Sequence, residues 1–297
     1  MLGFLQNREK VDKEKVGKGK PDSSGLVLDL SGPVLRRAFE HLREAAEPTG
    51  GVERYVSAIA LKASLFEEIL GKGKIDEMSR TDFLDLAAFM TPVRRRMSAN
   101  LDEKSLSQIT LAIASLLDGW SDVSTTDKRM QNFVGSFPED KSHRWVRDLG
   151  AEILHYVAPQ LYPLMSRWMW DKKVGSGVLR EIWFLDPNAK TTEILVNDDF
   201  ATFDLMREEL SGFLRENGVF RDFEFYCDLL CAHIYAGYIN DMGGQYLKSD
   251  FVDSPDPMMH TRRMLGLDAI NTETGRSRLK LIDGKAHKLG GDALMLN

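Results

Sequence analysis

Residues 145–184 read WVRDLGAEILHYVAPQLYPLMSRWMWDKKVGSGVLREIWF. The stretch holds four of the five tryptophans of the protein: Trp145, Trp168, Trp170 and Trp183. Apolar residues repeat at helical spacing in its first half, whereas apolar and polar residues alternate from Leu164 onward. Helices have a period of about 3.6 residues and strands a period of about 2, so this change predicts a helix followed by strands.

The alternating half predicts a small antiparallel β-hairpin or meander near residues 164–196. Trp168 and Trp170 point to the same side of the first strand in this interpretation. Residues 172–177, KKVGSG, are typical of a hairpin loop, and residues 178–184 alternate again as the returning strand. Residues 193–196 can supply a third strand.

The rest of the chain is dominated by helical periodicity. Apolar stripes predict helices at about 33–46, 52–70, 81–91, 103–117, 138–158, 203–216, 221–242 and 257–265. The loops between the first four helices are short, which favours antiparallel neighbours. We therefore expect a mainly α protein with a helical bundle-like core and the β insertion described above.

Composition shifts divide the chain into four regions. Residues 1–24 alternate lysines and acids and are expected to be a disordered charged arm. Residues 25–120 form an N-terminal helical region, and residues 138–266 form a C-terminal helical region with the β insertion. Residues 267–297 are expected to be a loosely ordered tail. The two helical regions either share one core or form two lobes.

Charge and hydropathy restrict the class of protein. The chain has 297 residues, a net charge of −6 and an isoelectric point near 5.6, which argues against a surface that binds nucleic acid everywhere. No uncharged apolar run reaches the roughly 18 residues that a membrane helix needs. The two cysteines lie four residues apart in a helical pattern, which argues against a disulfide framework and favours a cytoplasmic location.

The tryptophan-rich stretch also contains arginines, and this combination is typical of protein-binding hot spots. Five residues form this candidate partner site: Arg167, Trp168, Trp170, Arg180 and Trp183. If their side chains pack onto the helices, they are core residues instead. The tip of the N-terminal arm carries three apolar residues: Leu2, Phe4 and Leu5. This tip is a second candidate partner contact, or it is an ordinary frayed terminus.

Glu152 and His155 form an E-x-x-H pattern, which is a candidate metal site. At this spacing both side chains can reach one ion, as in helical bundles that bind two metals. A second E-x-x-H is absent, although two carboxylates of a later helix could contribute: Glu224 and Asp228. The alternative is that Glu152 pairs with an arginine such as Arg167 or Arg180, and that His155 is a surface or capping group.

Arg94, Arg95 and Arg96 form a local cationic cluster that could contact phosphates or nucleic acid. Three consecutive residues of a helix fan out over about 200°, so they make a broad face rather than a clamp. The alternative is a solvated face balanced by nearby acids.

Cys227, Cys231 and His233 resemble a thiol or soft-metal site in composition only. Both cysteines lie on a buried stripe, whereas His233 projects away from it in an ideal helix. We therefore expect small core residues here.

No phosphate loop, zinc ribbon or catalytic triad pattern occurs. We expect a non-enzymatic helical adaptor or assembly protein that contacts a protein partner and needs no cofactor. One alternative is a protein or enzyme that binds a small ligand or a divalent metal around Glu152 and His155. A second alternative is a nucleic-acid accessory protein that uses the arginines at 94–96.

Overall fold

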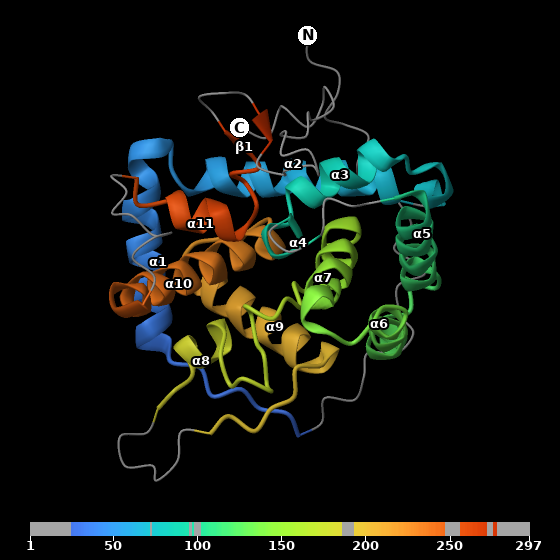
Figure 1. Cartoon of the computed structure of the whole chain (residues 1–297). Coiled ribbons are helices and arrows are strands. Elements are labelled where there is room, and N and C mark those ends of the chain that lie inside the picture. Colours follow the sequence, from blue (N-terminus) through green and yellow to red (C-terminus); the bar gives the residue numbers. More distant parts are fainter. Residues whose placement is uncertain are drawn as a thin grey trace.

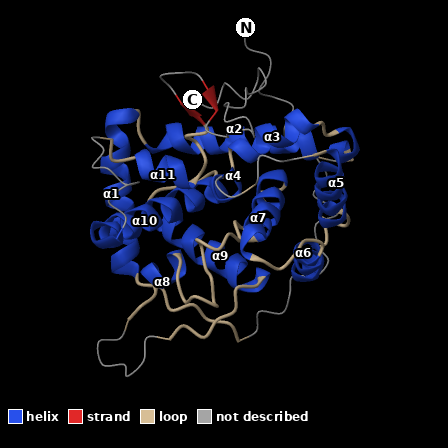
Figure 2. Ribbon diagram, viewed as in Figure 1, coloured by secondary structure: helices blue, strands red, loops and turns tan. Residues whose placement is uncertain are grey.

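The computed structural model describes residues 25–71, 73–94, 97, 102–185, 193–246, 256–271 and 276–277. For residues 242–246, 270–271 and 276–277 only the backbone is described. The described chain is mainly helical, as expected (Figure 2). The predicted arm at 1–24, with Leu2, Phe4 and Leu5, lies outside the described residues, as does most of the predicted tail at 267–297.

The described elements are mostly helices, and the longest connections lie on either side of α8 (Figure 1). The α-helices before the tryptophan-rich stretch are α1 (Gly32–Ala46), α2 (Val52–Leu70), α3 (Arg80–Ala88), α4 (Thr91–Arg94), α5 (Glu103–Leu117) and α6 (Thr126–Gly135). The remaining α-helices are α7 (Trp145–Val157), α8 (Val178–Ile182), α9 (Phe200–Glu216), α10 (Phe223–Tyr246) and α11 (Met259–Met264). The 3-10 helices are η1 (Glu47–Thr49), η2 (Lys74–Glu77), η3 (Val123–Thr125) and η4 (Lys141–His143). Two short strands, β1 (Ile270–Asn271) and β2 (Arg276–Ser277), pair antiparallel.

Side-chain caps fix where several helices begin. Ser79 and Asp82 form a reciprocal capping box at α3, and the Asp102 carboxylate accepts the backbone N–H of Ser105 at α5. Such caps satisfy backbone N–H groups that have no partner within the helix. Asp140 caps η4 in the same way, and α7 therefore begins at Trp145 rather than at residue 138 as the sequence suggested.

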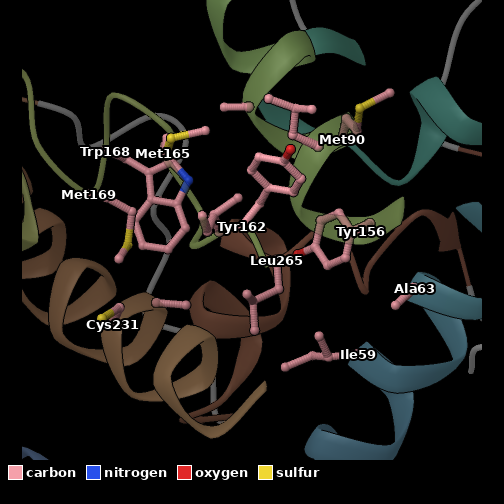
Figure 3. Close-up of a cluster of buried hydrophobic side chains, with 14 of the residues drawn as sticks. Ile59, Ala63, Met90, Tyr156, Tyr162, Met165, Trp168, Met169, Cys231 and Leu265 are labelled. Carbon is pink, nitrogen blue, oxygen red and sulfur yellow. The ribbon is translucent and has the colours of Figure 1, made fainter. Parts of the chain in front are cut away.

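Helices α7 and α10 organise the packing. Helix α7 contacts α2, α4, α5 and α6, whereas α10 contacts α1, α2, α8, α9 and α11. Helix α2 touches both and joins the two predicted helical regions. Their buried apolar side chains form one continuous cluster, part of which is drawn in Figure 3. The division into helical regions at 25–120 and 138–266 stays a prediction.

The predicted β-hairpin is not confirmed. Within the described part of 164–196, the only strand-like pairings are isolated bridges, one of which joins Asp171 to Ser176. The chain therefore turns at the predicted loop, but the prediction of a returning strand at 178–184 is wrong. This segment forms α8 instead. Its buried residues follow a helical spacing: Val178, Leu179 and Ile182.

Glycine allows the loop before α8 to fold back on itself. Gly177 has φ +127°, and a Cβ atom added there would lie 2.8 Å from the carbonyl oxygen of Met169. The N–H groups of Val178 and Leu179 donate to the carbonyls of Trp168 and Met169, both at 3.0 Å. The start of α8 is therefore held by the loop that carries the two tryptophans.

Within the described residues, no helix is long and apolar enough to cross a membrane.

Candidate functional site

Three ionisable side chains lie on one face of α7 and are all buried: Asp148, Glu152 and His155. Their spacing places them within about 60° of one another around the helix axis. Ionisable side chains are rarely buried unless they are paired, so each of the three needs a partner from another element. The structure supplies a different partner for each.

Glu152 is paired with Lys62 of α2. The Nζ atom of Lys62 lies 3.0 Å from the Oε2 atom of Glu152, and the lysine is 0% exposed. The same Nζ donates to the carbonyl oxygen of Leu265 at 2.9 Å and lies 3.9 Å from the centre of the Tyr156 ring. A carboxylate, a carbonyl and an aromatic face therefore surround the amine.

Burial acts on both members of this pair. Burial lowers the pKa of Lys62, while the charge of Glu152 opposes that change. Burial likewise raises the pKa of Glu152, while the charge of Lys62 opposes it. The carbonyl of Leu265 and the Tyr156 ring both favour a cationic amine over a neutral one. These two contacts therefore oppose the effect of burial on the charged amine.

His155 is paired with Asp228 of α10. Its Nδ1 atom lies 2.8 Å from the carbonyl oxygen of Tyr162, which can only accept, so Nδ1 carries a proton. Its Nε2 atom lies 2.7 Å from the Oδ2 atom of Asp228. Partners on both ring nitrogens therefore fix the orientation of the imidazole.

These partners change the interpretation of the E-x-x-H pattern. Glu152 faces the Lys62 amine, and both ring nitrogens of His155 have protein partners. In the part of the chain that the structure describes, no three His, Cys, Asp or Glu residues gather as a metal site. The predicted arginine partner of Glu152 is also wrong, because the cation is a lysine and Arg167 pairs elsewhere.

Arg167 forms a two-point ion pair with Asp148. Its Nη2 and Nε atoms lie 2.6 Å and 3.2 Å from the Oδ2 atom of Asp148, and its backbone N–H donates to Oδ1 at 3.1 Å. Nη2 also donates to the carbonyl of Arg144 at 2.7 Å. The planar fork of arginine suits such contacts, so the guanidinium is fixed in one orientation.

This ion pair forms part of the wall of a cleft of about 520 Å³. The cleft lies between α4, α7, α10, α11 and the loop that precedes α8, elements that meet near the centre of Figure 1. Its lining residues are Thr91, Pro92, Asp148, Arg167, Trp168, Asp171, Ser176, Tyr235, Ile239 and Met264. Pockets of about 300–1,000 Å³ are the usual size for small-molecule sites.

Trp168 and Trp170 are core residues and do not form an exposed aromatic surface. Trp168 is 7% exposed and Trp170 is 1% exposed. Trp168 lies near Met165 and Met169 within the apolar core (Figure 3). Trp183 is half-buried and its backbone pairs with Leu30. The predicted aromatic–arginine contact surface is therefore wrong, because its members are buried or half-buried, and only Arg167 and Trp168 among them line the cleft.

Arg94 also points inward, and its side chain is 5% exposed. It forms an ion pair with Asp268 and donates to the carbonyl of Ala88 at 3.0 Å. Arg95 and Arg96 lie outside the described residues. The prediction of a basic face that includes Arg94 is therefore wrong for this residue. Arg180 is half-buried on α8 and does not line the cleft.

Cys227 and Cys231 are buried core residues, as expected. The hydroxyl of Ser211 lies 3.7 Å from the Cys227 sulfur. His233 instead contacts His41 of α1, with 2.8 Å between Nε2 and Nδ1, and Thr261 of α11 at 3.0 Å. Burial and the neighbouring His41 lower the pKa of His233 to about 4.

Sequence reasoning missed Lys62, Asp148 and Tyr235 as site residues. The signal for Lys62 was present, because this lysine occupies a place in the apolar stripe between Ile59 and Phe66. Asp148 lies in the same stripe as Glu152, one turn earlier. Tyr235 gave no signal, because polar and apolar residues are spread around α10 and no single direction stands out.

Comparison of the chain with protein-family models, with curated proteins and with solved structures gives no match.

Proposed function

We propose that the protein is a helical small-molecule-binding protein and that the ligand binds in the cleft lined by α4, α7, α10 and the loop before α8. The cleft itself is the observation that carries the proposal. Its volume of about 520 Å³ suits a small organic molecule rather than a single ion. Aromatic, aliphatic and charged groups converge on it, which is the usual composition of such sites.

The rigidity of the cleft wall supports binding in a preformed site. Arg167 is fixed by Asp148 and by the Arg144 carbonyl, and Trp168 is held in the core. The Lys62–Glu152 and His155–Asp228 pairs lie behind it and tie α7 to α2 and α10. A site whose side chains are already ordered loses little entropy when a ligand binds.

This proposal replaces the adaptor hypothesis because the aromatic surface that the adaptor needed is buried. It keeps the small-ligand alternative but moves its centre from Glu152 and His155 to Asp148, one turn earlier on α7. The buried pairs then serve as support for the cleft wall. No chemical reaction is assigned to the protein.

The test is retention of small molecules from a cell extract, measured by native mass spectrometry of the full chain. Ser176 lines the cleft, so Ser176→Trp fills part of it. Ser57 is exposed on α2 and does not line the cleft, so Ser57→Trp is the matched control. We expect the unchanged protein and Ser57→Trp to retain the same compound.

We expect Ser176→Trp to bind the compound at least about tenfold more weakly, which corresponds to about 1.4 kcal/mol of binding free energy. Equal retention by a folded Ser176→Trp variant would place any ligand elsewhere and reject the proposal. Far-UV circular dichroism of both variants establishes that they are folded.

A further inference from the structure

Three aromatic side chains form a continuous row beside the cleft, and two of them, Trp168 and Tyr235, line it. The ring centres of Trp168 and Tyr235 lie 5.9 Å apart, and those of Tyr235 and Tyr238 lie 5.8 Å apart. Tyr235 is half-buried and lines the cleft. The faces of such rings carry negative potential and attract cations.

The charges that line the cleft are unbalanced. Arg167 neutralises Asp148, because the two form a bidentate ion pair. Asp171 accepts the backbone N–H of Val174 at 3.1 Å, and no described lysine or arginine forms an ion pair with it. Arg167 also attracts Asp171 electrostatically, but two carboxylates and one guanidinium leave the described lining with a net negative charge.

The surroundings of Tyr235 add further negative potential. Burial raises the pKa of its hydroxyl, and Tyr238, Glu181, Asp148 and Asp171 raise it further. Glu181 of α8 is itself half-buried, and burial raises its pKa as well. A cation at this place would gain from both the carboxylates and the rings.

Resting on the proposed binding function, we infer that the ligand of this cleft is an organic cation, with an ammonium group on an apolar body. The ammonium group lies between Asp171 and the aromatic row of Trp168 and Tyr235. The apolar body lies against Pro92, Ile239 and Met264, which line the cleft with them. Such a site combines a cation–π contact with one charge-assisted hydrogen bond.

The experiment uses matched sets of probes that differ only in charge. Each set has an amine, an alcohol and a carboxylate on the same body, with phenyl, cyclohexyl and indole bodies. Binding to the full chain is measured by saturation-transfer NMR and titration calorimetry. We expect the amines to bind about tenfold or more tightly than the matching alcohols, as a desolvated cation–π contact allows.

Asp171→Asn separates charge from structure, because asparagine can still accept the N–H of Val174. We expect this variant to lose the preference for amines while its affinity for alcohols stays unchanged. Asp76 is exposed and distant from the cleft lining, so Asp76→Asn is the matched control and keeps the preference.

Two results overturn the inference in different ways. If alcohols or carboxylates bind as tightly as amines, and Ser176→Trp abolishes that binding, the ligand site stands and the cationic class is wrong. If no probe of any charge shows binding that Ser176→Trp removes, the cleft is not the ligand site and both proposals fall.

Discussion

The Lys62 amine and the Glu152 carboxylate are 3.0 Å apart and are both shielded from solvent in the centre of the protein. Lys62 lies on α2 and Glu152 lies on α7, 90 residues later in the sequence. Removing two charges from water is costly, and their attraction offsets this only while both are present. The pair therefore makes the packing of α2 against α7 specific to this arrangement.

Replacing Lys62 alone is expected to destabilise the protein strongly. Lys62→Met keeps much of the side-chain volume but leaves Glu152 buried without its cation. We expect the free energy of unfolding to fall by about 3–5 kcal/mol, as for other broken buried pairs. Urea denaturation measures this value, with Lys104→Met as an exposed control expected to change it by less than about 0.5 kcal/mol.

The double variant Lys62→Met, Glu152→Leu removes both charges and should regain most of that loss. If the double variant is as unstable as Lys62→Met, the loss comes from packing and the ion-pair explanation is wrong.

Gly266→Ala is expected to destabilise the turn after α11. A Cβ atom there would lie 1.8 Å from the carbonyl oxygen of Phe89, and Gly266 has φ +73°. Gly73 has a similar φ of +81° with nothing within 4 Å, so Gly73→Ala measures the backbone strain alone. We expect Gly266→Ala to lose about 1–3 kcal/mol more than Gly73→Ala, because the clash adds an overpacking penalty. Similar losses in the two variants would contradict this close approach.

His233 is expected to make stability depend on pH. Its pKa is about 4 in the folded protein against 6.5 for the ordinary side chain, so the unfolded chain binds the proton more tightly. The neutral His233 therefore contributes its full share of the free energy of unfolding above pH 6.5. That contribution, about 3 kcal/mol in all, is lost as the pH falls toward 4. His41 on α1 is the neighbouring titratable group.

Urea titrations at pH 7 and at acidic pH test this dependence. His233→Gln should flatten the change in unfolding free energy between the two pH values. An unaltered pH profile in His233→Gln would assign the dependence to other groups.

Both thiols are expected to be unreactive in the folded protein. Burial raises the pKa of Cys227 to about 12, and it raises the pKa of Cys231 well above the ordinary value. The thiolate is the reactive form, so a disulfide reagent at mildly alkaline pH should modify neither group until the chain unfolds. Thiol release followed through a denaturant titration should coincide with the circular dichroism transition. Rapid modification of one thiol in the native protein would show that the helix α10 surface opens locally.

Periodicity alone located most helices correctly. The predicted ranges 52–70 and 103–117 coincide with α2 and α5, because their buried residues repeat every three or four positions. The alternation around Trp168 and Trp170 predicted a strand wrongly, because both side chains are buried in a tightly turned loop. A strand that is solvated on one face gives the same alternating pattern.

The candidate site was only partly predictable. Glu152 stood out as a carboxylate inside an apolar stripe, and this marked it as a residue that needs a partner. The partner could not be chosen, because Lys62, Arg167 and Arg180 were all plausible cations and sequence carries no distances. The cleft depends on five separate elements, so no single stretch of sequence encodes it.

The bond from the Lys62 amine to the Leu265 carbonyl spans 203 residues and joins an early helix to one of the last described turns. During synthesis, the lysine emerges long before this acceptor exists. The growing polypeptide must therefore keep α2 loosely associated, or leave the amine hydrated, until the final turns have been made. Long-range contacts of this kind slow folding and prolong exposure to aggregation, so this protein should depend on chaperones more than its helical content suggests.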